Sequence, residues 1–341
     1  MPANEIEIDV LPDGQRVGLK AFKKTNPRRR PSVSHARDSM YRKRYDKGSM
    51  DEWRNPDPFP TPAPNDVHVW LADLSRRRDA ARSLRDMLSA DESERADRFQ
   101  LDESRDRYIV ARATLRLILG QYLRQNPASL KFSYGPKGKP MLETGGEFAT
   151  IHLLSPPRGE RIEVRGDATR ESCHPHPDPL PPKAGEGARE QSRDFFYFNV
   201  AHCGALALYG FTRAGPIGVD LEYVDRSTAD VDDIARRFFS AAEFAALESL
   251  PTEHRRLGFF NGWTRKEAFV KAVGDGLSMP LDRFEVTLAP DVPARLVRFE
   301  DDPDAAGRWF MASIEPAEQC VGAVAVRGRV NGLSLWRAPE F

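Results

Sequence analysis

Two proline-rich, polar stretches divide the sequence and limit which residues can build a core. Residues 1–65 lack sustained helical or strand periodicity and end with a proline at every second position from Pro56 to Pro64. Residues 146–193 are polar and contain seven more prolines. Proline donates no backbone hydrogen bond and favours extended linkers. We therefore predict four segments: a basic, disordered N-terminal extension (1–65), an N-terminal half (66–145), a disordered insertion (146–193) and a C-terminal half (194–341).

Charge is balanced over the whole chain but not along it. The 51 lysines and arginines offset 51 aspartates and glutamates, so the formal net charge is zero. This excludes a wholly basic nucleic-acid binder, and we do not expect nucleic acid as a partner. Residues 16–47 nevertheless hold twelve lysines and arginines against two acids. Such a stretch fits a solvated tail or an arm for acidic partners, and we favour the tail.

The sequence carries no signal for a membrane or for secretion. The apolar stretches 204–211 and 320–326 are far shorter than the ~18–20 residues of a membrane-spanning helix. The N-terminus has acids and no apolar run typical of a signal peptide. Cys173, Cys203 and Cys320 are isolated and odd in number, which fits neither a disulfide framework nor a zinc ribbon. We therefore expect a cytoplasmic protein without membrane contacts.

Helix and strand signals begin after the proline run. Alternation of apolar residues predicts a strand at 67–71, and Ser89 followed by Glu92 has the spacing of a capping box. Apolar residues at helical spacing predict a helix over 104–123. Further strands are predicted at 132–134, 195–200, 205–211, 217–223, 284–288, 309–314 and 322–326. The mixture of helices and strands indicates an α+β fold.

Two more helices are predicted between the strands of the C-terminal half. Ser240 and Glu243 have the spacing of a second capping box, and Pro251 ends the helix that follows. Thr252 is placed to cap the next helix, which we expect to end at Gly274 because glycine accepts the left-handed conformation of a helix terminus.

The first group of residues with chemical potential is the pair Asp220 and Glu222 in the strand 217–223. Side chains alternate along a strand, so both carboxylates project from one face while Val219 and Leu221 enter the core. Two carboxylates this close repel each other unless a cation lies between them. Oxygen ligands point to Mg²⁺ or Mn²⁺. The alternative is an ordinary exposed strand face.

The second group lies on the helix that follows. Positions four residues apart share one stripe, so Trp263, Glu267 and Lys271 line up, and Lys266 lies on the neighbouring stripe. Glu267 could complete a metal site and the lysines could neutralise phosphate. The alternative is a packed Trp263 beside an ordinary surface pair of Glu267 and Lys271.

The third group is basic. Residues 135–140 place two lysines, Lys137 and Lys139, on a tight turn suited to a phosphate, although the spacing of a P-loop is absent. Arg107 lies on the predicted helix 104–123. His202, on a short turn between two strands, could donate to a phosphate, or it could be a structural turn residue.

The order of these motifs resembles that of the 4′-phosphopantetheinyl transferases, and among them the larger, monomeric Sfp-type class. The resemblance spans roughly residues 66–145 and 194–290. It rests on F-N-V-A-H-C (198–203), I-G-V-D-L-E (217–222), R-F-F-S-A-A-E-F (237–244) and W-T-R-K-E-A-F-V-K (263–271), with S-A-D-E-S-E-R-A-D-R-F (89–99) and Y-G-P-K-G-K-P (134–140) upstream.

The resemblance implies a fold of two similar α/β halves related by a pseudo-twofold axis, with coenzyme A bound in the cleft between them. It implies transfer of the phosphopantetheine arm to a serine of an apo acyl, peptidyl or aryl carrier protein, with release of 3′,5′-ADP. Mg²⁺, or Mn²⁺ in its place, would be held by Asp220, Glu222 and Glu267. The resemblance assigns catalytic roles to Glu243, Lys266 and Glu222. It assigns contacts with coenzyme A to Lys139, His202, Lys271 and Arg107.

Three points stay open. The family suggests Glu243 as the base, but this residue also has a structural reason to be present in its capping box, so metal-bound water or Glu222 could take the serine proton instead. The family's S-H-S is Ala201-His202-Cys203 here, which removes a hydroxyl near the phosphate. A catalytically silent descendant that binds coenzyme A or a carrier protein is the alternative to an active enzyme.

Overall fold

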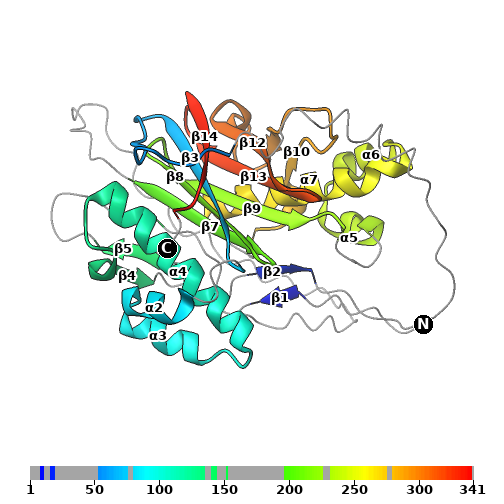
Figure 1. The fold of residues 1–341 in the computed structure, drawn as a ribbon. Helices are drawn as coiled ribbons and strands as arrows, with labels where there is room; N and C mark the ends of the chain where they lie inside the picture. The colour runs from blue at the N-terminus through cyan, green and yellow to red at the C-terminus, as the bar shows by residue number, and fades with distance from the viewer. Residues whose placement is uncertain are drawn as a thin grey trace, which may run out of the picture.

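The computed structural model describes residues 8–10, 16–19, 53–75, 80–134, 140–143, 151–152, 196–225, 231–274 and 279–339 (Figure 1). Helices and strands are mixed throughout these ranges, which confirms the predicted α+β class. Among the described residues, no helix is both long enough and apolar enough to cross a membrane.

The first sheet combines strands from both ends of the chain. Its order is β14 (Gly332–Arg337), β3 (Asp66–Asp73), β8 (Leu206–Thr212) and β7 (Tyr197–Cys203). β3 and β8 are antiparallel, as are β8 and β7, whereas β14 runs parallel to β3. Helix α4 (Asp102–Leu123) packs on one face of this sheet, where Trp70 of β3 and Tyr209 of β8 meet its apolar side.

The second sheet has the order β12 (Trp309–Ala317), β13 (Cys320–Arg327) and β9 (Ile217–Tyr223), with all neighbours antiparallel. Helix α7 (Thr252–Val273) covers it, and Phe269 of α7 packs with Ala323 and Ala325 of β13. In β13 the alternate residues Val324 and Val326 turn to the other face.

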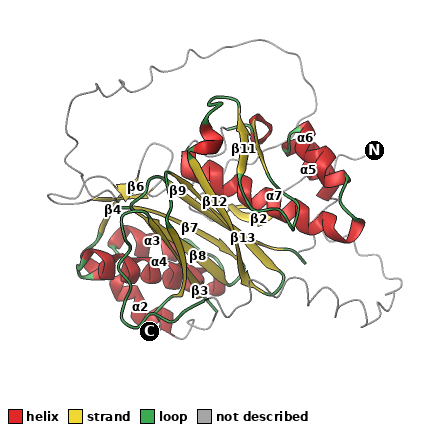
Figure 2. Cartoon of the chain, turned by 90° about the horizontal axis from the view of Figure 1, so that it is seen from above, coloured by secondary structure: helices red, strands yellow, loops and turns green. Residues whose placement is uncertain are grey.

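The two sheets pack face to face between the two long helices (Figure 2). Val67, Val69 and Leu71 of β3 share a core cluster with Val219 and other residues of the second sheet. The packing is close: a Cβ on Gly210 of β8 would lie 2.7 Å from Val219 Cγ1 of β9. Burial of this kind contributes roughly 25 cal/mol per Å² of apolar surface.

Each sheet repeats one order of elements. A strand (β3 or β9) leads to a 22-residue helix (α4 or α7) and then to a hairpin whose second strand lies in the middle of the sheet. This order is what two similar halves require, and their twofold relation stays a prediction. The boundary of the halves differs from the one predicted, because β7 and β8 pair with β3 of the N-terminal half although they lie within 194–341.

The packed part of the chain begins earlier than residue 66. Arg54 forms a parallel bridge with Trp336 of β14, and the buried Trp53 donates from its indole Nε1 to the carbonyl of Glu315 at 3.1 Å. Phe59 stacks on Trp70 with ring centroids 4.9 Å apart. Residues 53–65 were predicted as part of a disordered extension because their prolines hide any periodicity, yet large aromatic side chains hold them on the sheet.

The shorter helices and strands complete the two flanks. The helices are α2 (Ala81–Leu84), α3 (Ala90–Asp97), α5 (Val231–Phe238) and α6 (Ala241–Glu248). The strands are β1 (Ile8–Val10) with β2 (Arg16–Leu19), β4 (Lys131–Tyr134) with β5 (Pro140–Glu143) and β6 (Ile151–His152), and β10 (Phe284–Val286) with β11 (Leu296–Phe299). β1, β2 and β6 lie within stretches predicted to be disordered.

Both predicted capping boxes are present. Ser89 N donates to Glu92 Oε2 at 3.1 Å at the start of α3, and Ser240 N donates to Glu243 Oε2 at 2.9 Å at the start of α6. Glu92 also accepts from Arg116 Nε of α4 at 2.7 Å, which ties α3 to the long helix. The prediction that Thr252 caps α7 is wrong, because Pro251 occupies the cap position and Thr252 is the first helical residue.

A buried histidine links β3 to α4. Trp70 Nε1 donates to Tyr122 Oη at 2.8 Å, and His68 Nδ1 lies 2.8 Å from the same oxygen. Because the tryptophan is a donor, the tyrosine hydrogen is left to donate to His68 Nδ1, which requires the neutral ring. Burial lowers the pKa of His68 from 6.5 to about 4, and the charge of Asp66 opposes this only in part.

Acid should therefore destabilise the protein through His68. The ring is neutral when folded and takes up a proton near pH 6.5 when unfolded, so stability falls as pH drops from about 6.5 to about 4. We expect a loss of about 2 kcal/mol from this group at pH 5 relative to pH 7.5. Urea unfolding of the wild type and of His68→Gln at both pH values measures this loss in the free energy of unfolding. An equal loss in the two proteins would contradict the assignment.

Candidate functional site

The acidic pair of β9 lies on the face that α7 covers. Val219 and Leu221 enter the core between the sheets, so the alternate residues Asp220 and Glu222 point to the other side, as predicted. Their exposed fractions are 7% and 4%. The alternative of an ordinary solvent-exposed strand face is thereby excluded, and two carboxylates are buried side by side.

Helix α7 approaches β9 closely because Gly218 has no side chain. A Cβ at this position would overlap the carbonyl oxygen of Ala268 and come within 2.6 Å of Ala272 N. The helix backbone therefore rests directly on the strand two residues before Asp220. This contact brings Glu267 and Lys271 of α7 to the level of the acidic pair.

Lys271 and Asp220 form an ion pair at the centre of the site. Lys271 Nζ donates to Asp220 Oδ1 at 2.7 Å and to the carbonyl of Val219 at 3.1 Å. The lysine thus crosses from the helix to the strand. The alternative of an ordinary surface pair does not describe Lys271, because its Nζ binds a buried carboxylate of β9.

The other oxygen of Asp220 is buried without a hydrogen-bond partner among the described residues. Burial raises the pKa of Asp220 to about 7, the Lys271 charge opposes the rise, and the nearby charges of Glu222 and Glu267 add to it. A carboxylate oxygen left in this state gains from any bound cation. The three predicted metal ligands therefore lie within electrostatic reach of one another.

The three carboxylates do not form a ready ligand set. Within the ranges that the structure describes, no three histidine, cysteine, aspartate or glutamate side chains are grouped as ligands of one metal ion. Like charges repel, so an open arrangement is expected without a cation between the carboxylates. The donor chemistry fits Mg²⁺ or Mn²⁺, since carboxylate oxygens are their preferred ligands and Asp220 Oδ2 has no hydrogen-bond partner in the part of the chain that the structure describes.

Cys203 is a member of the site that the sequence did not reveal. Its Sγ donates to Glu222 Oε2 at 3.3 Å, and both side chains are buried. In the sequence, Ala201-His202-Cys203 indicates only the loss of a hydroxyl. The available signal was alternation on β7, which puts Ala201 and Cys203 on the face toward the second sheet, but no sequence pattern shows that this face meets Glu222.

Positive charge gathers beside the acidic pair. Burial, together with the nearby charges of Lys271 and Arg107, lowers the pKa of His202 to about 4. His202 is therefore neutral at pH 7. Arg107 of α4 donates to Glu103 Oε1 at 2.7 Å, while its buried Nε has no hydrogen-bond partner among the described residues. The residues predicted to contact coenzyme A from α4, β7 and α7, namely Arg107, His202 and Lys271, thus lie near one another. Lys139, the fourth predicted contact, lies outside the described residues.

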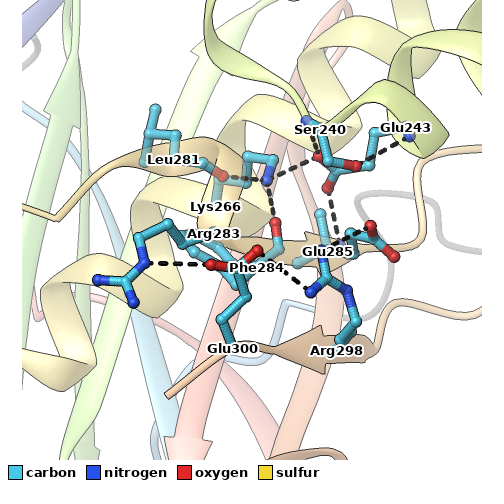
Figure 3. A network of polar contacts seen from close by, with 10 residues as sticks. Ser240, Glu243, Lys266, Leu281, Arg283, Phe284, Glu285, Arg298 and Glu300 are labelled. Carbon is cyan, nitrogen blue, oxygen red and sulfur yellow. Dashed lines mark hydrogen bonds and ion pairs between the residues drawn. The ribbon is translucent and has the colours of Figure 1, made fainter. Parts of the chain in front are cut away.

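Glu243 and Lys266 lie in a different contact network, shown in Figure 3. Lys266 Nζ is 2.8 Å from Glu243 Oε2, and it donates to the carbonyls of Leu281 and Phe284 at 2.6 Å each. All three ammonium hydrogens therefore have acceptors. In this arrangement Lys266 has no ammonium hydrogen left for a phosphate, and its side chain is fully buried. Its predicted phosphate contact stays a prediction.

Comparison with known proteins adds to this geometry. Residues 216–324 match a sequence model described as the 4′-phosphopantetheinyl transferase superfamily. The chain is 34% identical over 276 residues to the 4′-phosphopantetheinyl transferase HetI of Nostoc sp., which covers 81% of this chain and 94% of HetI. The chain belongs to the 4′-phosphopantetheinyl transferase superfamily. It is a 4′-phosphopantetheinyl transferase, as its resemblance to the Sfp-type class implied.

Two further relatives show how the similarity is spread. A putative 4′-phosphopantetheinyl transferase of Synechocystis sp. is 30% identical over 227 residues, covering 67% of this chain and 72% of the relative. The 4′-phosphopantetheinyl transferase Sfp of Bacillus subtilis is 37% identical over 95 residues, covering 28% of this chain and 41% of Sfp. The superfamily match of residues 216–324 begins just before β9 and ends within β13.

Replacing Gly218 should separate α7 from β9. Gly218→Ala adds a methyl group that collides with two backbone atoms, which cannot move aside like the tip of a side chain. We expect a loss of about 3 kcal/mol or more in the free energy of unfolding. Gly307→Ala is the matched control, because nothing lies within 4 Å of its Cβ. Equal stability of the two variants by urea unfolding would show that the helix does not rest on the strand here.

Proposed function

We propose that this chain transfers the 4′-phosphopantetheine arm of coenzyme A to a serine hydroxyl of an apo carrier protein, with Mg²⁺, and releases 3′,5′-ADP. The observation that carries the proposal is the buried acidic pair of β9 beside Lys271, with one oxygen of Asp220 left without a hydrogen-bond partner among the described residues. Membership of the superfamily supports the same reaction. We expect the enzyme to act as a monomer in the cytoplasm.

The bond changes follow from the products. The serine oxygen forms a bond to the phosphorus that carries the pantetheine arm, and the bond from that phosphorus to the oxygen bridging to ADP breaks. The bridging oxygen leaves with 3′,5′-ADP, and the serine proton goes to a base. Because negative charge shifts onto the leaving phosphate, the reaction needs cations and in-line alignment more than covalent chemistry.

The cationic side chains fit the phosphates of coenzyme A. Lys271 would donate to a phosphate oxygen from the hydrogen not used by Asp220 and Val219. Arg107 has a buried Nε without a partner in the described residues, so it can donate there without breaking a contact. His202 is neutral, so it would donate one ring N–H and add no charge.

The metal would be held by Asp220, Glu222 and Glu267. When bound, it neutralises negative charge on the phosphates. Glu222 is the carboxylate of the site that we assign to the serine proton, since Glu243 has both oxygens engaged by Ser240 N, Val286 N and Lys266. The thiol of Cys203 would keep the Glu222 carboxylate oriented.

The rival function is a silent descendant that binds coenzyme A or a carrier protein without transfer. Burying two carboxylates costs free energy, which a bound cation offsets. A module that only binds coenzyme A or a carrier protein has no need of such a cation site.

Removing a predicted metal ligand should stop transfer. We expect Asp220→Ala and Glu267→Ala each to lower the transfer rate at least about a hundredfold while the protein stays folded, since charge neutralisation contributes several kcal/mol. The matched control is Asp225→Asn, which changes an exposed carboxylate just after β9. Rates are read from carrier modification, and circular dichroism checks the fold. Folded variants with wild-type rates would contradict the assignment.

The function itself is tested by weighing the carrier protein. Purified enzyme, Mg²⁺, coenzyme A and an apo carrier protein are mixed, and the carrier is measured by mass spectrometry. We expect a gain of one phosphopantetheine per carrier and the appearance of 3′,5′-ADP. Coenzyme A binding without any gain of mass on several carriers would favour the silent binding module instead.

A further inference from the structure

Lys266 is a fully buried lysine whose surroundings are complete. Its ammonium group has three acceptors: Glu243 Oε2, the carbonyl of Leu281 and the carbonyl of Phe284. The ring of Phe284 lies under it as well, with the centroid 4.2 Å from Nζ. A buried charge persists only when paired and hydrogen-bonded, and here every hydrogen is used.

Glu243 is equally occupied. Oε2 accepts from Ser240 N at 2.9 Å and faces Lys266 Nζ at 2.8 Å, while Oε1 accepts from Val286 N at 2.8 Å. Ser240 caps α6, Lys266 lies in α7 and Val286 lies in β10. Figure 3 shows Ser240, Glu243 and Lys266 close together. The carboxylate therefore connects three elements, and each of its oxygens already accepts a hydrogen bond from the protein.

The pair also holds the segment that follows α7 in the chain. Leu281, Phe284 and Val286 all bind it through backbone atoms, so the connection does not depend on their side chains. Ion pairs at the surface continue the contact outward: Arg283 lies 3.2 Å from Glu300, and Arg298 lies 3.2 Å from Glu285. The segment is thereby fixed against the side of α7 that carries Lys266.

Helix α7 is held by two different contacts. Its backbone touches β9 at Gly218, and Lys266 binds it to the segment 281–286 and to α6. Residues 266 and 267 are about 100° apart around a helix. Fixing Lys266 on one side therefore fixes the rotation at which Glu267 and Lys271 face Asp220.

We propose that Glu243 and Lys266 are a positioning pair, which sets the rotation of α7 and so the place of Glu267 and Lys271, and that neither touches substrate. The inference rests on the proposed transfer reaction. It replaces the catalytic base that the resemblance suggested with a structural contact between α6, α7 and β10.

The test compares Glu243→Gln, Lys266→Met and the double variant that combines them. Each single change leaves one buried charge without its partner, whereas the double variant leaves none. We expect each single variant to lose about tenfold or more in kcat, and the double variant to return to within about threefold of wild type. The pH dependence of kcat should be unchanged in the double variant, because no titrating group of the reaction has been removed.

Glu300→Gln is the matched control, because it removes surface ion pairs of the same segment, and its kcat should stay within about twofold of wild type. A folded double variant as slow as Glu243→Gln, or loss of the acidic limb of the pH profile, would overturn the proposal and make Glu243 the base. A double variant that does not fold would overturn the proposal too. If the pair only positions α7, the uncharged glutamine and methionine should hold the helix in place.

A second measurement keeps this test separate from the proposed function. Mn²⁺ binding by calorimetry needs no turnover, and we expect about tenfold weaker binding in the single variants and recovery in the double variant. If the wild-type protein modifies no carrier, the proposed function fails while recovery of Mn²⁺ binding still supports the positioning pair. Unchanged Mn²⁺ affinity in folded single variants would contradict the pair's effect on Glu267.

Discussion

The direct contact of two backbones at Gly218 is the constraint on which the site depends. Strand β9 and helix α7 meet there without an intervening side chain, at a position two residues from Asp220. The strand supplies the carboxylates and the helix supplies Lys271, which reaches Asp220 at 2.7 Å. The distance between helix and strand thus determines whether this ion pair forms. Everything else around α7, from the sheet behind β9 to the segment 281–286, keeps the helix against the strand.

Local patterns in the sequence predict β9 with the bounds 217–223 that it has, because alternation and a glycine before the acids are both strong signals. They also predict the extent of α7, except that Pro251 and not Thr252 occupies its N-cap position. They miss β14, whose pairing partner β3 lies at the other end of the chain. Alternation predicts that Asp220 and Glu222 share one face of β9, whereas no local pattern predicts the contacts of Lys266. A helical stripe tells which residues share a side but not that residues 281–286 cover that side.

Two lysines five residues apart on α7 form buried ion pairs of opposite character. All three ammonium hydrogens of Lys266 have acceptors, and both oxygens of Glu243 accept hydrogen bonds from the protein. The pair therefore has no free donor to offer a ligand. Lys271 and Asp220 leave one carboxylate oxygen without a partner in the described structure and lie beside two more acids. In a buried site, incomplete satisfaction is costly and marks the place where a ligand contributes most.

The aromatic anchor near the start of the packed chain has a practical consequence for engineering. Trp53 is buried and bonded to the strand β12, Arg54 runs beside β14, and Phe59 stacks on Trp70. The proline run suggests residue 66 as a place to truncate the chain. Such a truncation would remove these contacts from the edge where the two sheets meet. A shortened protein that keeps Trp53 onward retains the anchor but loses β1 and β2. Because β2 contacts β7, an effect of that truncation combines the loss of this contact with the loss of basic charge.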